Sequence, residues 1–358
     1  MSEQMLPHVS QISAAMTAHH AYDDRPANVV HLHNAAGMTA SFMDIGATWL
    51  SCNLPMKEER REVLLRSPDM DAHKVQKAYL GAIVGRFANR INNSRFLLSG
   101  TEYVLAANEG ENTLHGGVNG FDKQRWVIKS QTPQQVVFTL FSVDGDQGFP
   151  GNLSVKVTYT LTNDNSVEIG YEAICDADCP INLTNHAYFN LNGEESGAKS
   201  LDHSLKMHAS HYLPTRADLI PTGEQRKVTS TAFDFNVAKT ILRDFLIDDD
   251  QVMAGGYDHA FMLVPEYCDG KAAVATVVSP DEAVTMTIMT TKPAIQFYSG
   301  NFLQNTAGAS HIYEKYEGLA LETQYLPDGP NQPQWGALSG IQQAKVPYQH
   351  ITRYRFVY

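Results

Sequence analysis

Residues 180–193 carry the most informative group of side chains in the chain. Read as a β-strand, this segment has one largely apolar face. Its other face carries Asn182, Thr184, His186, Tyr188 and Asn190. All five can form hydrogen bonds and none has a fixed charge, which suits a polyol ligand that needs directional hydrogen bonds and an aromatic surface. A polar sheet face with no ligand is the competing interpretation.

A second segment, residues 319–326, places an acidic side chain inside an otherwise apolar strand. Glu322 and Gln324 share one face of it, and leucine and tyrosine side chains share the other. Such a carboxyl group is either exposed on the outside of a sheet or held in a site where loss of water raises its pKa. The residues alone leave both possibilities open.

Three further motifs offer chemistry, and each also has an ordinary structural explanation. His115 precedes two glycines, which let a backbone approach a ligand but equally suit a tight turn. Arg86 and Arg90 are four positions apart and could be surface arginines. Asp258 precedes His259, a pairing of carboxylate and imidazole that often arises by chance.

Metal and redox motifs are weak. His31 and His33 would share one strand face, but no third ligand is recognisable, so we expect no metal there. Cys175 and Cys179 are spaced more widely than the C-x-x-C of zinc and redox sites. We therefore expect the 4 cysteines to be reduced thiols in a cytoplasmic protein.

Composition excludes several classes of function. The 358 residues include 27 Lys and Arg and 39 Asp and Glu, a net charge of −12, with 43% hydrophobic and 18% charged residues. This is a globular profile, and the chain is long enough to bury a large core. So acidic a surface disfavours nucleic acid as a partner. Neither a basic, apolar leader at the N-terminus nor an apolar run of membrane-spanning length is evident, so we expect no membrane partner.

The elements that must position these residues are mainly strands. Strict alternation over Leu153–Leu161, turn residues at 163–165 and renewed alternation from Val167 to Ala173 predict a β-hairpin. Further short strands are predicted at residues 29–33, 38–43, 136–141, 284–289, 294–298 and 319–326.

Helical signals are few. One helix is predicted from Ser67, as its cap, to about Lys77, and a second near residues 237–246, while residues 248–250 are interpreted as a turn. The chain has no G-x-G-x-x-G or Walker loop, so no nucleotide cofactor is expected. We expect one all-β domain over residues 1–358.

Taken together, the motifs resemble the galactose mutarotase (aldose 1-epimerase) family. The resemblance covers about residues 30–358, and about the first 25 residues form an unassigned N-terminal extension. The matching stretches are 85–91 (GRFANRI), 112–117 (NTLHGG), 120–123 (GFDK) with Trp126, 144–152 (DGDQGFPGN), 182–191 (NLTNHAYFNL), 256–259 (GYDH), 296–301 (QFYSGN), and 321–324 (LETQ) with Pro327 and Asp328. The resemblance implies a β-supersandwich fold.

The resemblance also implies roles for individual residues. His186 would be the general acid and Glu322 the general base. The groups that would contact the sugar are Asn89, Arg90, His115, Tyr188, Asp258 and Gln296, whereas Arg86 would be structural. The substrates would be free aldoses such as D-galactose and D-glucose, with no cofactor and no metal, and the protein would be a monomer or homodimer.

Mutarotation needs one base at the C1 hydroxyl and one acid at the ring oxygen, each contributing roughly 10²–10⁴-fold. We expect Glu322 as carboxylate beside His186 as imidazolium, and hence a bell-shaped pH–rate profile.

Three alternatives stay open on the residues alone. They are a retaining glycosidase using Asp258 and Glu322, a sugar-phosphate epimerase using Arg90, and a sugar-binding module without catalysis.

Overall fold

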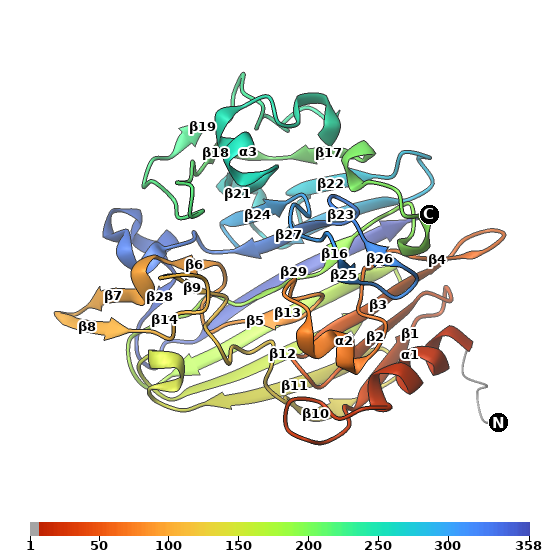
Figure 1. The fold of residues 1–358 in the computed structure, drawn as a ribbon, viewed down its shortest axis with the longest axis horizontal. Helices are drawn as coiled ribbons and strands as arrows, with labels where there is room; N and C mark the ends of the chain where they lie inside the picture. The colour runs from red at the N-terminus through yellow and green to blue at the C-terminus, as the bar shows by residue number, and fades with distance from the viewer. Residues whose placement is uncertain (1–6) are drawn as a thin grey trace.

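The computed structural model describes residues 7–358, and all of its paired strands are antiparallel. Residues 1–6, part of the predicted N-terminal extension, lie outside the described residues. Figure 1 shows a broad sheet crossing the molecule, with smaller sheets against it. The largest sheet runs in the order β10 (Val127–Gln131), β11 (Gln135–Ser142), β12 (Leu153–Leu161), β13 (Ser166–Cys175), β29 (Tyr348–Val357), β23 (Thr285–Thr290), β22 (Ala275–Val278), β17 (Ser204–Met207), β20 (Lys239–Thr240).

Two smaller sheets complete the main framework. One runs β16 (Tyr188–Phe189), β27 (Leu319–Gln324), β24 (Ala294–Tyr298), β21 (Asp258–Leu263), β18 (Ala209–Tyr212), β19 (Arg226–Lys227). The other runs β1 (Val29–His33), β2 (Thr39–Met43), β3 (Thr48–Pro55), β4 (Arg60–Glu62). Short pairs join β5 (Ile83–Val84) to β15 (Thr184–Asn185), β6 (Arg90–Ile91) to β9 (Thr113–Leu114), β7 (Arg95–Leu98) to β8 (Thr101–Val104), β14 (Cys179–Pro180) to β28 (Ile341–Gln342), and β25 (Thr306–Ala307) to β26 (Ile312–Tyr313).

The predicted hairpin is confirmed as β12 and β13. Their register runs without a break from Leu153 opposite Cys175 to Leu161 opposite Val167. The odd-numbered side chains of β12 are buried and the even-numbered ones are partly or fully exposed, as the alternation predicts. The other predicted strands are also present, with ends that shift by at most two residues.

Three aromatic rings show where the three large sheets meet. Trp49 of β3, Phe189 of β16 and Tyr354 of β29 contact one another, with ring centroids 5.2–5.8 Å apart. All three are fully buried. Because each ring comes from a different sheet, their mutual packing stabilises the sheets against one another.

Helices account for most of the wrong predictions. Helix α2 spans Met70–Val75, and its cap is Asp69, which accepts a hydrogen bond from the Ala72 amide, rather than Ser67. The helix expected near residues 237–246 is instead strand β20 followed by a single 3₁₀ turn over Ile241–Asp244.

Two helices were not predicted. The acidic run at 248–250 is not a turn, because Asp248 caps helix α3 (Asp249–Ala254), whose first turn favours acidic side chains. Helix α1 (Pro7–Thr17) lies beside β1 and packs Ile12 and Met16 against Met43 and Leu50. It lacks acidic residues in its first turn and basic residues in its last, so the sequence gives little sign of its ends.

The segment 180–193 is not one continuous strand. Its backbone pairs in succession with β28, β5 and β27 through the two-residue strands β14, β15 and β16. Residues 180–191 are all buried. The alternation seen in the sequence therefore reflects a buried chain that passes between sheets.

Across residues 7–358, the structure contains no helix with the length and hydropathy needed to cross a membrane. All 4 cysteines fall in this range and none forms a disulfide.

Candidate active site

A cavity of about 290 Å³ opens beside the sheet that contains β27. It is lined by Lys77, Ala78, Tyr79, Asn89, Arg90, Glu109, Leu114, His115, His186, Tyr188, Asp258, Tyr298, Phe302 and Glu322. Seven of the eight predicted site residues are among these, and the eighth, Gln296, hydrogen-bonds one of them. The cavity therefore gathers residues that are up to 245 positions apart in the sequence.

Strand register explains how the central side chains meet. On β24, Gln296 lies opposite Glu322 of β27, and Tyr298 lies opposite Asp258 of β21. Side chains directly opposite each other, and side chains two positions apart on one strand, share a face of a sheet. All four side chains therefore lie on the same face.

His186 joins this face from the other side of β27. Strand β16 pairs Tyr188 with Ala320, and continuing that register by two residues places His186 opposite Glu322. Nε2 of His186 lies 3.6 Å from Oε1 of Glu322. Both side chains are buried, with 5% and 2% of their residue surface exposed. A potential acid and a potential base thus lie side by side at the bottom of the cavity.

Burial shifts the two groups in opposite directions. It raises the pKa of Glu322 well above its usual value, and the charge of Asp258 adds to this increase. It lowers the pKa of His186 to about 4. Burial therefore disfavours both charged forms, the carboxylate and the imidazolium. Burial thus opposes the carboxylate and imidazolium that we expect from the attraction of opposite charges.

Two tyrosine rings lie close to the imidazole of His186. The ring of Tyr188 stacks on it at 4.9 Å and that of Tyr79 at 5.9 Å, with interplanar angles of 27° and 21°. Aromatic faces attract cations, so these rings stabilise the protonated imidazole and partly oppose the effect of burial.

Several polar atoms in this group have no hydrogen-bond partner within the protein. They are Nδ1 of His186, Oε2 of Glu322 and Oε1 of Gln296, all of which are buried. Buried polar atoms are nearly always hydrogen-bonded in folded proteins. Their lack of protein partners leaves donors and acceptors for a polar ligand in this part of the molecule.

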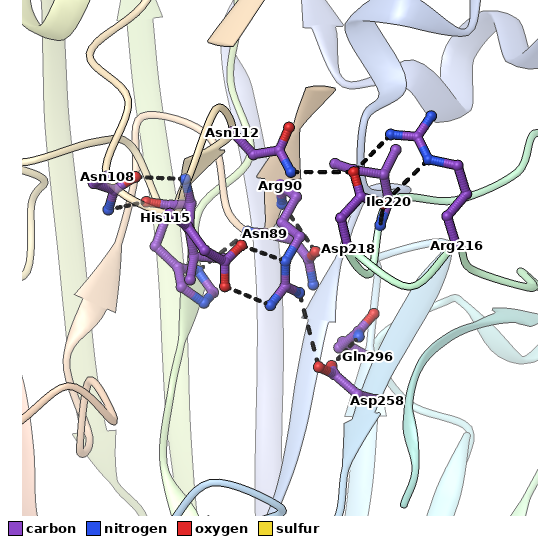
Figure 2. A network of polar contacts seen from close by, with 12 residues as sticks. Asn89, Arg90, Asn108, Asn112, His115, Arg216, Asp218, Ile220, Asp258 and Gln296 are labelled. Atoms are coloured by element: carbon purple, nitrogen blue, oxygen red, sulfur yellow. Dashed lines mark hydrogen bonds and ion pairs between the residues drawn. The ribbon is translucent and has the colours of Figure 1, made fainter. Parts of the chain in front are cut away.

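Arg90 lies between two carboxylates (Figure 2). Its Nε and Nη2 donate to Oε2 and Oε1 of Glu109 at 2.6 and 2.8 Å, and Nη1 lies 3.8 Å from Oδ2 of Asp258. Asp258 in turn accepts a hydrogen bond of 2.7 Å from Nε2 of Gln296. This network fixes the guanidinium and both carboxylates in the cavity wall.

His115 is held by the backbone of Asn89. The Asn89 amide donates to Nδ1 of His115 at 3.1 Å, and pairing of β6 with β9 brings these residues together. Gly116 is required beside them, because a Cβ there would lie 1.9 Å from the Gly85 carbonyl oxygen. Burial, with the adjacent His186, lowers the pKa of His115 well below its usual value. The neutral ring therefore carries its proton on Nε2, where it can donate to a ligand.

Three potential ligand atoms lie within 4.8 Å of one another, a spacing that could hold a metal ion. They are one nitrogen from each of His115 and His186 and one oxygen of Glu322. The tautomer of His115 argues against this use. Its Nδ1 accepts the Asn89 amide and its Nε2 carries the proton, so neither nitrogen offers a lone pair. The donor set therefore fits a hydroxyl-bearing ligand better than a metal.

The remaining candidates lie outside the cavity lining. Arg86 is not a surface residue: it is 2% exposed and donates to the backbone carbonyls of Ser142, Val143, Pro150 and Gly151. The side chain of His31 lies within hydrogen-bond distance of the hydroxyl groups of Ser13 and Ser41.

Sequence reasoning missed three notable residues of the cavity. Tyr298 could have been found, because it shares a strand face with Gln296. Glu109 stood in a polar loop with no feature to separate it from its neighbours. Tyr79 had no signal, since its position depends on a left-handed backbone conformation with φ of 55°.

Comparisons with known proteins identify the family of the chain. The family model described as aldose 1-epimerase matches residues 28–355. The chain belongs to the aldose 1-epimerase family. It is 46% identical over 339 residues to the aldose 1-epimerase of Escherichia coli K12, covering 94% of this chain and 97% of that protein. It is 38% identical over 300 residues to human galactose mutarotase, covering 82% and 84% of the two chains.

Solved structures related to this aldose 1-epimerase family member show the same fold. The GalM/aldose epimerase homologue from C. elegans superposes with a TM-score of 0.84 at 28% identity, covering 93% of this chain and 99% of that chain. Galactose 1-epimerase from Lactobacillus acidophilus NCFM gives a TM-score of 0.81 at 28% identity, covering 95% and 97%. The predicted all-β, galactose mutarotase-like fold is confirmed.

Proposed function

We propose that the chain catalyses the interconversion of α and β anomers of free hexoses such as D-galactose and D-glucose. The observation that carries the proposal is the buried pair of His186 and Glu322, 3.6 Å apart at the bottom of the cavity. Family membership supports the same reaction. Mutarotation transfers only protons, so an acid and a base beside one hemiacetal suffice.

The proposed reaction moves one proton through the sugar. Glu322 takes the proton of the C1 hydroxyl while His186 gives one to the ring oxygen, and the C1–O5 bond breaks to give the open-chain aldehyde. Rotation about C1–C2 turns the other face of the carbonyl toward the ring oxygen. The O5 hydroxyl then attacks C1, His186 recovers its proton and Glu322 returns its own to the new C1 hydroxyl.

This cycle starts from the ion-pair form of the pair, whereas burial favours the neutral form. Both forms hold the same single proton, so they interconvert without exchange with solvent. We propose that sugar hydroxyl groups which donate to Glu322, together with the rings of Tyr79 and Tyr188, favour the ion pair when substrate binds.

We assign sugar binding to the other residues of the predicted set. Nε2–H of His115 and the guanidinium of Arg90 would donate to hydroxyl oxygens, and Asp258 would accept from hydroxyl groups. Asn89, Gln296 and Tyr188 would complete the contacts. The unpartnered Oε1 of Gln296 supports a role for its side chain in ligand binding.

We further propose one domain acting in the cytoplasm, as a monomer or homodimer. Acid, base and binding groups all come from one chain, so catalysis needs no second subunit. The unpaired cysteines agree with a reducing compartment. Cell fractionation would test the compartment, and sedimentation would test the oligomeric state.

Polarimetry tests the activity itself. Fresh α-D-galactose and α-D-glucose are dissolved with and without the native protein, and the relaxation of optical rotation is followed. We expect catalytic amounts of protein to speed the relaxation of at least one sugar severalfold or more. Equal rates in both cuvettes for both sugars would refute the proposal, and release of reducing sugar from a glycoside would favour a glycosidase instead.

A further inference from the structure

The charge around Arg90 bears on which sugars the cavity accepts. Arg90 is the most deeply buried cation of the lining, with 7% of its side chain exposed. Both of its flanking groups are carboxylates, and Glu109 engages it through two hydrogen bonds. Because an arginine stays protonated, this bidentate pair fixes one guanidinium and one carboxylate in a defined geometry.

Glu109 lies at the outer side of this network. Its side chain is 37% exposed, against 9% for Asp258. The acid–base pair lies at the buried end of the cavity, so the part of a sugar that does not react must extend toward the exposed end. That part of the substrate therefore approaches Glu109.

Hydrogen bonds made by Asn112 anchor the loop that carries Glu109. Asn112 donates its amide to the carbonyl of Glu109 at 2.9 Å, and its side chain reaches Asp218 at 3.5 Å. Asp218 also pairs with Arg216, as Figure 2 shows. A carboxylate on an anchored loop cannot easily withdraw from an incoming negative charge.

We propose that Glu109 makes this cavity selective for uncharged aldoses. It occupies two donors of Arg90 that could otherwise bind an anion, and it places a negative charge where a phosphate or carboxylate on the sugar would lie. Like charges at close range in a partly buried site are unfavourable, and a group that penalises the wrong ligand contributes to specificity. The inference rests on the proposed function and extends it to the choice among substrates.

The test compares neutral and anionic aldoses in the native protein and in variants. Anomer exchange of glucose, glucose 6-phosphate and glucuronate is measured by polarimetry or NMR after subtraction of the uncatalysed rate. We expect native kcat/KM to be at least about tenfold lower for both anions than for glucose. In Glu109→Gln, the ratio of anionic to neutral kcat/KM should rise about tenfold, chiefly through KM for the anions.

Two variants separate charge from position. Glu109→Asp keeps a carboxylate beside Arg90 on a side chain that is one methylene shorter, so its ratio should stay near that of the native protein. Glu102→Gln removes a carboxylate that pairs with Arg95 at the surface, where both side chains are more than half exposed, and should change nothing.

The outcomes distinguish this inference from the proposed function. A ratio that stays within twofold in Glu109→Gln, or that rises equally in Glu109→Asp or Glu102→Gln, would overturn the role of Glu109 while leaving mutarotation intact. Efficient native turnover of glucose 6-phosphate would also overturn it. A native protein that accelerates none of the three sugars, nor galactose, would overturn the function and the inference together.

Discussion

Nε2 of His186 lies 3.6 Å from Oε1 of Glu322. The two residues face each other because the short strand β16 pairs with β27. The same strand β27 pairs on its other edge with β24, which places Gln296 opposite Glu322. One strand in the middle of a sheet thus positions the base between the acid and a binding residue. The geometry depends on backbone hydrogen bonds and so is rigid.

The pH dependence follows from the opposite pKa shifts of the pair. Acidification below about pH 4 adds a second proton at His186, and alkalinisation past the raised pKa of Glu322 removes the only proton. Since only the form with one proton can work, kcat/KM should be constant between these limits and fall on both sides. Anomer exchange measured across the pH range checks this. A rate that falls on neither the acid side nor the alkaline side of this range would contradict the acid–base assignment.

The ring of Tyr79 should matter more than its hydroxyl. Its stacking on His186 favours the imidazolium, an effect of about 0.5–2 kcal/mol in cation–π contacts. We therefore expect Tyr79→Ala to lower kcat about tenfold, whereas Tyr79→Phe should stay within about twofold. Steady-state kinetics on both variants provide the measurement. Equal losses in the two would assign the effect to the hydroxyl, which contacts Asn108, rather than to the ring.

The packing of Phe189 should dominate stability where the sheets meet. Phe189→Ala removes a fully buried ring that contacts Trp49 and Tyr354, and should cost about 3–5 kcal/mol in the free energy of unfolding. Phe141→Ala, at a ring that is 62% exposed, serves as the control and should stay within about 0.5 kcal/mol. Urea unfolding of both variants would show the difference. Similar midpoints would mean that the three rings do not join the sheets.

The sequence predicted the parts of the fold that follow from local alternation. Strands β12 and β13 were found because each has one buried and one solvated face over many residues. The interrupted strands of residues 180–193 were not resolved, because burial on all sides removes the difference between faces. Helix α3 was missed because the cap Asp248 and two further acids are equally typical of an exposed turn.

Within the site, the sequence supplied chemical types but not their environment. It left Glu322 either exposed or buried, and only the pairing of β16, β27 and β24 decides this in favour of burial. Arg90 was assigned by resemblance, yet its bond to Glu109 depends on how the loop 108–112 folds back. The lowered pKa of His186 could not be anticipated either, since it results from burial that only the fold reveals.

The most direct test of the acid–base pair is polarimetry of α-D-galactose with the native protein, Glu322→Gln and His186→Asn, matched against Glu102→Gln. Glu322→Gln keeps the size of the side chain and His186→Asn leaves a smaller polar one. Each removes the ability to exchange a proton, so kcat should fall by about 10²–10⁴-fold. Binding of galactose, followed by calorimetry, should persist in at least one of the two variants, and Glu102→Gln should match the native rate. Native-like kcat in either Glu322→Gln or His186→Asn would contradict the account.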